Sequence, residues 1–242
     1  MDAMEGRDSA PSSDPWLGKV RRHIIPICDT CVADADVDGG AVALVSSEGV
    51  RAVVYATDDA SARLETLQVD LAEGPCVDAG TGSSPVLVGD LQDPREGVVD
   101  RWPFFLPQAD ALGIRGVFAF PVRIGSVVLG TFELYRLRAG GILGPQLSSA
   151  LRAAEDMGAA IVDLGRPAEG SSTDGVLLDA GVLGRSAASV HQAAGMVLVQ
   201  SDCTIDEAMA QLRANAFAEG VSLVTLSAEV ISGRRRFSKE QL

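Results

Sequence analysis

The feature that most constrains the fold is a pair of apolar runs, Gly116–Ile124 and Ser126–Arg136, that meet at Gly125. A Gly-Ser pair suits a two-residue hairpin turn, because glycine adopts the positive φ that a type II′ turn requires. In the second run, Val127, Leu129, Thr131 and Glu133 alternate with Val128, Gly130, Phe132 and Leu134, which is the period of a strand. The two runs therefore predict a hairpin at the centre of an antiparallel sheet.

Other segments extend this pattern to an α+β fold. Strands are expected at Ala41–Ser46, Val50–Ala56 and Pro85–Val88, which are short apolar runs bounded by turn residues. Helical spacing covers Trp16–Ala33, where Pro26 should start a new helix or kink this one. A shorter helix is expected at Asp59–Leu67.

A longer helix is predicted over Pro145–Leu164. Its stripe consists of Leu147, Leu151, Ala154, Gly158 and Ile161, at steps of four and three residues. Such a narrow seam suits packing on a partner helix, and it equally suits simple coverage of the sheet.

After residue 175 the strand pattern does not return. The segment Arg166–Gly175 has no apolar periodicity and reads as a linker, and Ala187–Gln200 predicts one helix. Thr204 and Glu207 form a capping-box pattern at the start of a second helix, and Gly220 suits its C-cap. Ser222 begins a third. The predicted domains are a flexible tail at 1–15, an α+β domain at 16–165, a linker at 166–186 and a three-helix domain at 187–237.

The charge distribution singles out the helical third of the chain. The net charge is −13, which argues against a general polyanion binder. Residues 1–175 carry a net −12 and residues 176–242 a net −1, and the latter end in the basic cluster Arg234–Arg236. No apolar run reaches the ~20 residues that span a bilayer. With no signal-peptide pattern, these features predict a cytoplasmic protein.

No motif supports catalysis, so we expect a binding protein rather than an enzyme. Walker A, H-E-x-x-H and G-x-S-x-G patterns are missing from the sequence. Cys28 and Cys31 form a C-x-x-C in an apolar helical stretch and read as core residues, with no metal site expected. Cys76 follows Gly74-Pro75 and is expected in a turn, where no sequence feature pairs it with a base.

Residues from about Lys19 to Leu164 resemble a GAF domain of the form found in actinobacterial regulators. The matching segments are Leu71–Cys76, Pro85–Val88, Arg101–Pro103, Val117–Val122, Leu129-Gly130 and Leu134–Arg136. The resemblance implies a small-molecule ligand over one face of the sheet and a homodimer formed through terminal helices. It leaves the ligand unknown among chromophores, haem and cyclic nucleotides. Potential pocket linings are Cys76, Trp102, Phe104, Phe118, Phe120 and Phe132.

Residues from about Ala187 to Phe237 resemble an ANTAR domain, the three-helix output of bacterial transcription antitermination regulators. The matching residues are His191–Met196, Asp206–Ala208, Leu212-Arg213, Ala216 and Ala228–Val230. The resemblance implies binding of RNA hairpins in leader transcripts. Many ANTAR domains have lysine where this chain has Ala194, so one phosphate contact is lost. The RNA-binding candidates are His191, Gln192, Gly195, Arg213, Asn215, Arg234, Arg235 and Arg236.

Together these features predict a signal-responsive antitermination regulator, in which a ligand-sensing GAF module controls an RNA-binding bundle. One alternative is an interaction protein whose helical module only dimerises or docks partners, which the acidic total charge and Ala194 favour. A second is a methionine sulfoxide reductase, which would need several cysteines to converge in the GAF pocket.

Overall fold

The computed structural model of the chain describes residues 15–45, 51–82, 84–165 and 183–238. The predicted hairpin is present in it. Strands β4 (Gly116–Ile124) and β5 (Val127–Arg136) pair antiparallel, and Gly125 occupies the turn at φ 58°. The two-residue loop confirms the expectation from the Gly-Ser pair.

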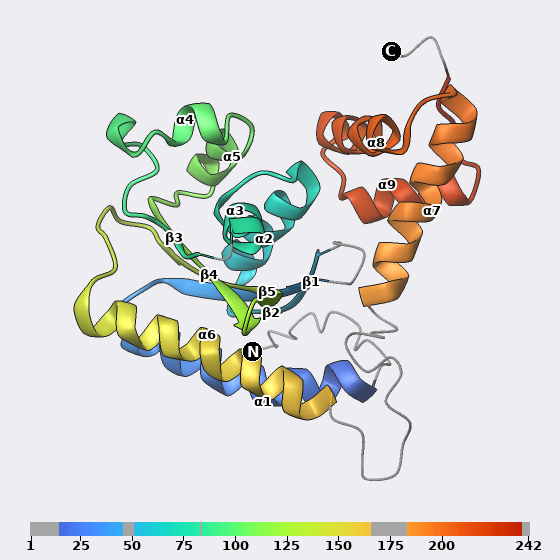
Figure 1. The fold of residues 1–242 in the computed structure, drawn as a ribbon. Coiled ribbons are helices and arrows are strands. Elements are labelled where there is room, and N and C mark those ends of the chain that lie inside the picture. The colour runs from blue at the N-terminus through green and yellow to red at the C-terminus, as the bar shows by residue number, and fades with distance from the viewer. Residues whose placement is uncertain (1–14, 46–50, 83, 166–182, 239–242) are drawn as a thin grey trace, which may run out of the picture.

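Three further strands complete one antiparallel sheet in the order β2-β1-β5-β4-β3. They are β1 (Gly39–Val45), β2 (Arg51–Ala56) and β3 (Val86–Val88). The central strands β1, β5 and β4 are buried over most of their length, because helices cover both faces of the sheet (Figure 1). A sheet covered in this way has apolar residues on both faces.

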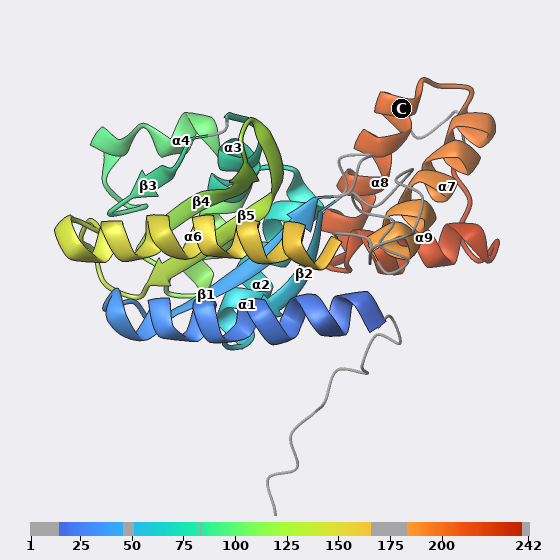
Figure 2. The same ribbon diagram turned by 60° about the horizontal axis from the view of Figure 1, so that its bottom comes forward.

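One face is covered by α1 (Pro15–Asp34) and α6 (Gly144–Gly165), which run side by side (Figure 2). The chain stays helical through Pro26, so no second helix starts there. The stripe on α6 packs on β4 and α1, and Gly158 allows the closest approach, since a Cβ there would stand 2.6 Å from the Arg123 carbonyl oxygen. Coverage of the sheet therefore accounts for most of the stripe, although Leu151 remains 39% exposed.

The other face is covered by α2 (Asp59–Leu71) and α3 (Pro75–Gly82). Beyond them lie a 3-10 turn at Pro94–Glu96, α4 (Val98–Arg101) and α5 (Phe105–Ala111). Helix α2 is one turn longer than the sequence indicates, and its C-cap residue Ala72 takes a left-handed conformation at φ 53°. Asp58 and Ser61 form a capping box at its start.

The helical module consists of α7 (Leu183–Ser201), α8 (Ile205–Glu219) and α9 (Leu223–Ile231). The capping box of Thr204 and Glu207 and the left-handed Gly220 cap, at φ 65°, are confirmed. Helix α7 begins four residues before the expected start at Ala187. Its own core is formed by residues of all three helices, among them Val197, Leu212 and Leu226.

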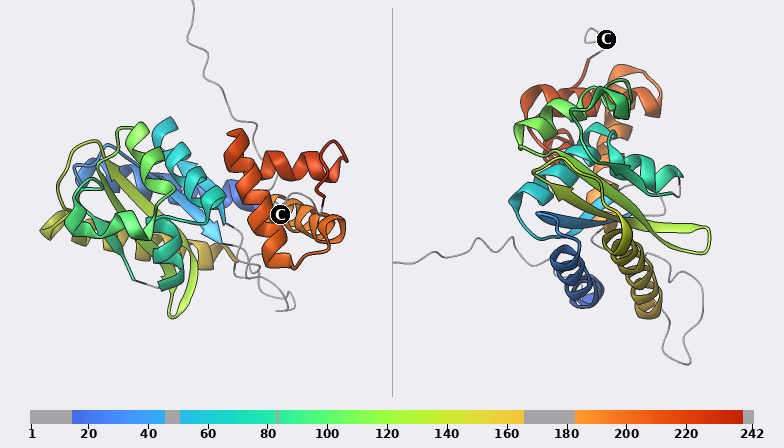
Figure 3. Two further views of the ribbon diagram at one scale, coloured as in Figure 1. Left: turned by 90° about the horizontal axis from the view of Figure 1, so that it is seen from above. Right: turned by 90° about the vertical axis from the view of Figure 1, so that its left-hand side faces the viewer.

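The helical module borders α2 and β2 of the N-terminal module, as two further views show (Figure 3). The tail at 1–14 and the linker at 166–182 lie outside the described residues. Within the described residues, no helix combines the length and apolarity that crossing a membrane requires.

Candidate functional site

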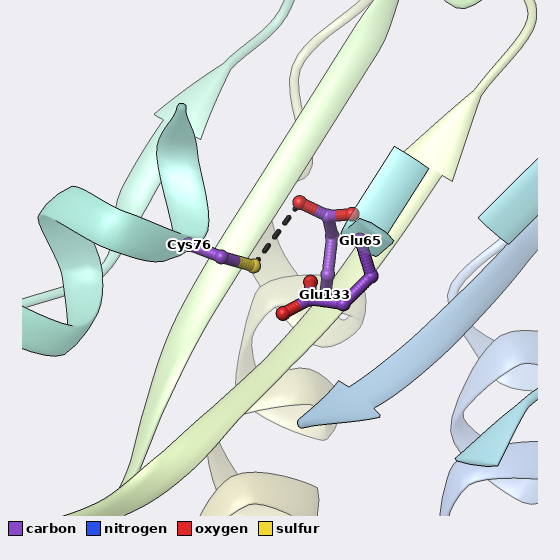
Figure 4. A group of neighbouring side chains, drawn as sticks. All are labelled: Glu65, Cys76 and Glu133. Carbon is purple, nitrogen blue, oxygen red and sulfur yellow. Dashed lines mark hydrogen bonds between the residues drawn. The ribbon is translucent and has the colours of Figure 1, made fainter. Parts of the chain in front are cut away.

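A buried polar cluster lies between the sheet and the helices α2 and α3 (Figure 4). It consists of Glu65 and Gln68 from α2, Cys76 from α3 and Glu133 from β5, each at most 1% exposed. Buried carboxyl groups are uncommon because removal from water is costly. The cluster is therefore the first candidate for a functional site.

The local fold brings these four side chains together. Glu65 and Gln68 are three residues apart on α2 and so lie on one face of that helix. Between α2 and α3, Gly74 takes φ 130°, and Pro75 opens α3, so Cys76 lies in the first turn of a helix. The expectation of a turn at Cys76 is therefore wrong, because the helix α3 already begins at Pro75. Glu133 joins from the centre of β5, on the face opposite to Phe132.

Hydrogen bonds fix the cluster. The Gln68 amide donates from Nε2 to Glu133 Oε2 at 2.6 Å, while its Oε1 accepts the backbone N–H of Cys76 at 2.7 Å. The Cys76 thiol donates to the same Glu133 oxygen at 3.1 Å. In this arrangement Cys76 carries its proton, and one carboxylate oxygen is shared by a thiol and an amide.

The same donors are suited to a divalent cation. Glu65, Cys76 and Glu133 each offer one ligand atom, and these atoms lie within 4.8 Å of one another. Zinc takes carboxylate oxygen and thiolate sulfur as ligands. Binding a metal would displace the thiol proton, because thiolate is the ligating form. A bound cation would therefore replace the hydrogen-bonded arrangement of the cluster.

The predicted ligand-lining residues are separated by the sheet. Cys76 is part of the cluster, and Trp102 is buried nearby with its indole N–H donating to Asp78 at 3.0 Å. Phe118, Phe120 and Phe132 lie on the opposite face, in the core formed with α1 and α6. The assignment of these three phenylalanines to a common pocket with Cys76 is wrong. Their alternation predicts that they share one face of the strands, but it does not predict whether α1 and α6 or α2 and α3 cover that face.

Sequence reasoning missed Glu65, Gln68 and Glu133. A signal for Glu133 existed, since it stands between Phe132 and Leu134 in the middle of the strongest strand. A lone charged residue at the centre of an apolar strand is a departure that indicates function or pairing. Glu65 and Gln68 gave no such signal, because charged and amide residues are ordinary in an amphipathic helix.

A second feature is the contact between the two modules, where Asp70 of α2 meets α9. The Leu223 backbone N–H donates to Asp70 Oδ1 at 3.0 Å. Leu223 is the first residue of α9, and its N–H has no partner within that helix. Burial raises the pKa of Asp70, and the hydrogen bond from Leu223 opposes that shift. A carboxylate from one module thus caps a helix of the other.

Beside this contact lies a cleft of about 600 Å³ between α2 and α8. Its walls include Arg63 and Leu67 of α2, and Ala216, Phe217 and Gly220 at the end of α8. At the rim, Phe104 and Phe217 make an edge-to-face contact with ring centroids 6.0 Å apart. Phe104, a predicted ligand residue, is 58% exposed and contacts the helical module instead of lining an inner pocket.

The RNA-binding candidates fall into three groups. His191, Gln192 and Gly195 are on α7, with Gln192 exposed and the other two half-buried. Arg213 and Asn215 are half-buried on α8. The third group is the cluster Arg234–Arg236, which follows α9.

Within the third group the three arginines differ. Arg235 forms an ion pair with Glu219 and donates to Asn215 Oδ1 at 3.0 Å, so both Arg235 and Asn215 are engaged in holding the end of the bundle. Arg234 and Arg236 are exposed. The basic segment is therefore tied to the bundle at its middle residue, and its outer two guanidinium groups face solvent.

No protein-family model and no curated protein matches the chain. Solved structures do resemble it. A GAF domain/HD domain protein from Geobacter sulfurreducens is 13% identical over 61% of this chain and 95% of that one, at a TM-score of 0.49. The GAF3 domain of a Synechocystis protein in its photoproduct state is 15% identical, covering 60% and 94%, at 0.46. The type II free methionine-R-sulfoxide reductase of Thermoplasma acidophilum is 13% identical, covering 62% and 96%, at 0.48. The likeness is one of fold, and it includes GAF domains.

Proposed function

We propose that this chain is a signal-responsive transcription antitermination regulator, in which a GAF-type module at 15–165 controls the binding of RNA hairpins by the helical module. The observation that carries the proposal is the position of α2. Its residues Glu65 and Gln68 belong to the buried polar cluster, and its Asp70 caps α9. A change at the cluster that moves α2 would therefore also move the Asp70 carboxylate that contacts the helical module.

The cluster supports a sensing role. A thiol, two carboxyl groups and an amide converge from three elements in a site shielded from water. Such groups respond to oxidation, protonation or a bound cation by exchanging hydrogen bonds. In this proposal the signal is a small molecule or redox cue that changes how α2 packs on the sheet.

One observation supports RNA binding by the helical module. Arg234 and Arg236 are exposed and close in sequence, which suits contacts to neighbouring phosphates. Ala194, which replaces a lysine common in ANTAR domains, is fully buried in the bundle core. At this interior position alanine offers no phosphate contact, so in this proposal the exposed arginines supply the contacts to RNA.

The test is capture of RNA from total RNA of the source cells by the purified chain. We compare it with an Arg234→Ala/Arg236→Ala double variant and with an Arg22→Ala/Arg152→Ala variant, which removes two exposed arginines from the other module. We expect hairpin RNAs to be enriched, the enrichment to fall with rising salt, and only the first variant to lose it. Equal loss in both variants, or no enrichment above background, contradicts RNA binding at this site.

A second candidate is an interaction module, favoured by Val199 of α7, which is 77% exposed. In that case the capture from total RNA finds no enrichment, whereas the same chain used as bait in a lysate of the source cells retains a protein or a second copy of the chain, and Val199→Ser abolishes that retention.

We also propose that the chain acts by binding and not by catalysis. Cys28 and Cys31 lie in the core on the α1 and α6 side of the sheet, whereas Cys76 lies on the other side. A sulfoxide reductase that uses converging cysteines would need them on one side. Assay of free methionine sulfoxide reduction with dithiothreitol as reductant tests this, and turnover that depends on Cys76 would overturn it.

A further inference from the structure

Residues 234–238, which follow α9 and form a strap on the bundle, alternate between exposed and covered positions. Arg234, Arg236 and Ser238 are exposed, whereas Arg235 is half-buried and Phe237 is 5% exposed. This period of two residues is that of an extended chain with one side against the protein. Arg234 and Arg236 therefore lie on the same side of the strap, the side that faces solvent.

Side-chain contacts hold the covered side of the strap on the bundle. The Arg235 guanidinium forms an ion pair with Glu219 and donates to Asn215 Oδ1 at 3.0 Å, and both partners lie near the end of α8. The Phe237 N–H donates at 2.8 Å to Gln200 Oε1, one residue before the end of α7. The Phe237 ring belongs to the bundle core. The strap is thus anchored to two helices besides the one that it follows.

The backbone and a supporting amide fix the start of the strap. Beyond the end of α9, Gly233 takes the left-handed conformation at φ 74°, which ends the helix and redirects the chain. The Arg235 N–H then donates to the Glu229 carbonyl oxygen at 3.2 Å. The amide of Asn215 is oriented as well, because its Nδ2 donates to the Gln211 carbonyl oxygen at 2.9 Å and so leaves Oδ1 to accept from Arg235.

Because the strap is anchored, binding an anion to it costs less than binding an anion to a flexible tail. A flexible tail loses backbone entropy when it contacts a partner, whereas the backbone of the strap is already ordered. Among the residues that the structure describes, no ion pair involves Arg234 or Arg236. Two residues of extended chain separate their Cα atoms by ~7 Å. Each guanidinium can bind a phosphate through two parallel N–H groups, so the pair suits neighbouring phosphates.

We propose that the strap is a preorganised phosphate-binding element, in which Gln200 and Glu219 are positioning residues that hold its exposed arginines in place for RNA. The inference rests on the proposed RNA-binding function. The negative charge of Glu219 alone disfavours RNA, which is a polyanion. In this proposal the ion pair of Glu219 with Arg235 outweighs that repulsion, because it orders the strap. Arg235 and Asn215 then support the strap and do not contact RNA themselves.

The experiment compares variants of the full chain. Gln200→Ala/Glu219→Ala removes both polar anchors and one negative charge. Gln200→Glu/Glu219→Gln keeps an accepting oxygen at each position and the net charge of the wild type. Asp206→Asn removes one exposed negative charge in the first turn of α8 and so controls for charge. Limited digestion with trypsin measures cleavage after the arginines of the strap without RNA, and capture from limiting total cellular RNA measures affinity.

We expect Gln200→Ala/Glu219→Ala to be cleaved in the strap about tenfold faster and to capture about tenfold less hairpin RNA, because the strap must then be ordered on binding. Gln200→Glu/Glu219→Gln should match the wild type in both measurements. Asp206→Asn should capture as much RNA as the wild type or slightly more. Binding governed by charge alone predicts the opposite sign for the alanine variant, so equal or greater capture by that variant overturns the positioning role.

Glu219→Ala alone keeps the Gln200 contact and should give changes of the same sign at about threefold. It replaces the double variant if circular dichroism shows that the double variant has lost its helices. Unchanged cleavage in the alanine variants overturns the anchored strap. If the wild type captures no hairpin RNA, the RNA function fails and the phosphate-binding role of the strap fails with it, while the cleavage rates still decide whether the strap is anchored.

Discussion

The Glu73 carboxylate accepts the backbone N–H of Phe104 at 2.8 Å and so fixes the residue that contacts the helical module. The same oxygen accepts the N–H of Phe105 at 2.9 Å. Phe105 is the first residue of α5, so these donors belong to a helix start that has no capping side chain of its own. Glu73 supplies the cap from 31 residues away in the sequence.

Removal of this cap should destabilise the chain. We expect Glu73→Ala to lower the free energy of unfolding by about 1.5 kcal/mol, since hydrogen bonds to a charged acceptor are worth about 1.5–3 kcal/mol and Glu73 is partly exposed. Glu73→Gln should lose about half as much, because the amide oxygen still accepts. Urea unfolding measures both, with exposed Glu96→Ala as the reference. Equal effects of Glu73→Ala and Glu96→Ala would show that the cap contributes nothing.

Loss of the Gln68 amide from the buried polar cluster should lower the free energy of unfolding more than loss of a surface amide. Gln68→Ala leaves Glu133 without its amide donor and the Cys76 N–H without its acceptor. Each buried group left without its partner costs about 1–3 kcal/mol, so we expect a loss of about 3 kcal/mol. Gln92→Ala is the matched control, since Gln92 is exposed, its amide donates to the Asp110 carboxylate, and its bond to Asp90 comes from the backbone N–H, which alanine keeps. Urea unfolding that finds the two variants within 0.5 kcal/mol, roughly the range of surface substitutions, contradicts the role of Gln68.

The elements of this fold could be predicted where the signal is local. The hairpin at Gly125, the capping box at Thr204 and the Gly220 cap depend on residues within a few positions of one another. The sequence predicts the start of α7 at Ala187 and not at Leu183, because the segment before Ala187 has little apolar periodicity.

The site could not be predicted in the same way, because it depends on which helices cover each face of the sheet. Both faces of β5 are buried, so the alternation of Phe132 and Glu133 does not tell which residue faces α3. Cys76 and Glu133 are 57 residues apart, and only the sheet order brings α3 over β5. The sequence groups Arg235 with Arg234 and Arg236 in one basic cluster, because its ion pair with Glu219 forms only when the end of α8 and the segment after α9 meet in the folded bundle.

The cysteines of α1 predict a loss of stability at high pH. Burial raises the pKa of Cys28 to about 12 and that of Cys31 to about 11, and the nearby carboxylates of Asp29 and Asp34 add to the shifts. The unfolded thiols titrate near 9.0, so above that pH the unfolded chain loses protons that the folded chain keeps. Stability contributed by these thiols is complete below pH 9 and falls as pH rises toward 11 or 12.

Urea unfolding at pH 8 and pH 10 measures the effect. Between these values we expect Cys28 and Cys31 together to account for a decrease of about 2–3 kcal/mol. The Cys28→Ala/Cys31→Ala variant removes both groups and keeps every other titrating side chain, so its decrease should be smaller than that of the wild type by this amount. The same decrease in both proteins would mean that these thiols are exposed to solvent or that they titrate normally.

Alanine substitution at two helix-interior glycines should change the stability of the chain in opposite directions. A Cβ at Gly158 would stand 2.6 Å from the Arg123 carbonyl oxygen, so α6 must move off β4, at a cost of about 1–3 kcal/mol that exceeds the gain in helix propensity. At Gly195, apart from the neighbouring backbone of α7 itself, no atom of the described residues lies within 4 Å of the added Cβ, and alanine should stabilise α7 by about 0.5–1 kcal/mol. Thermal unfolding measures both changes.

Because we expect Gly195→Ala to leave the bundle folded and more stable, the same variant also tests the predicted RNA contact. A fall in RNA capture places RNA against the backbone of α7 at Gly195, and unchanged capture removes Gly195 from the binding surface and leaves Arg213, Arg234 and Arg236 as its charged residues.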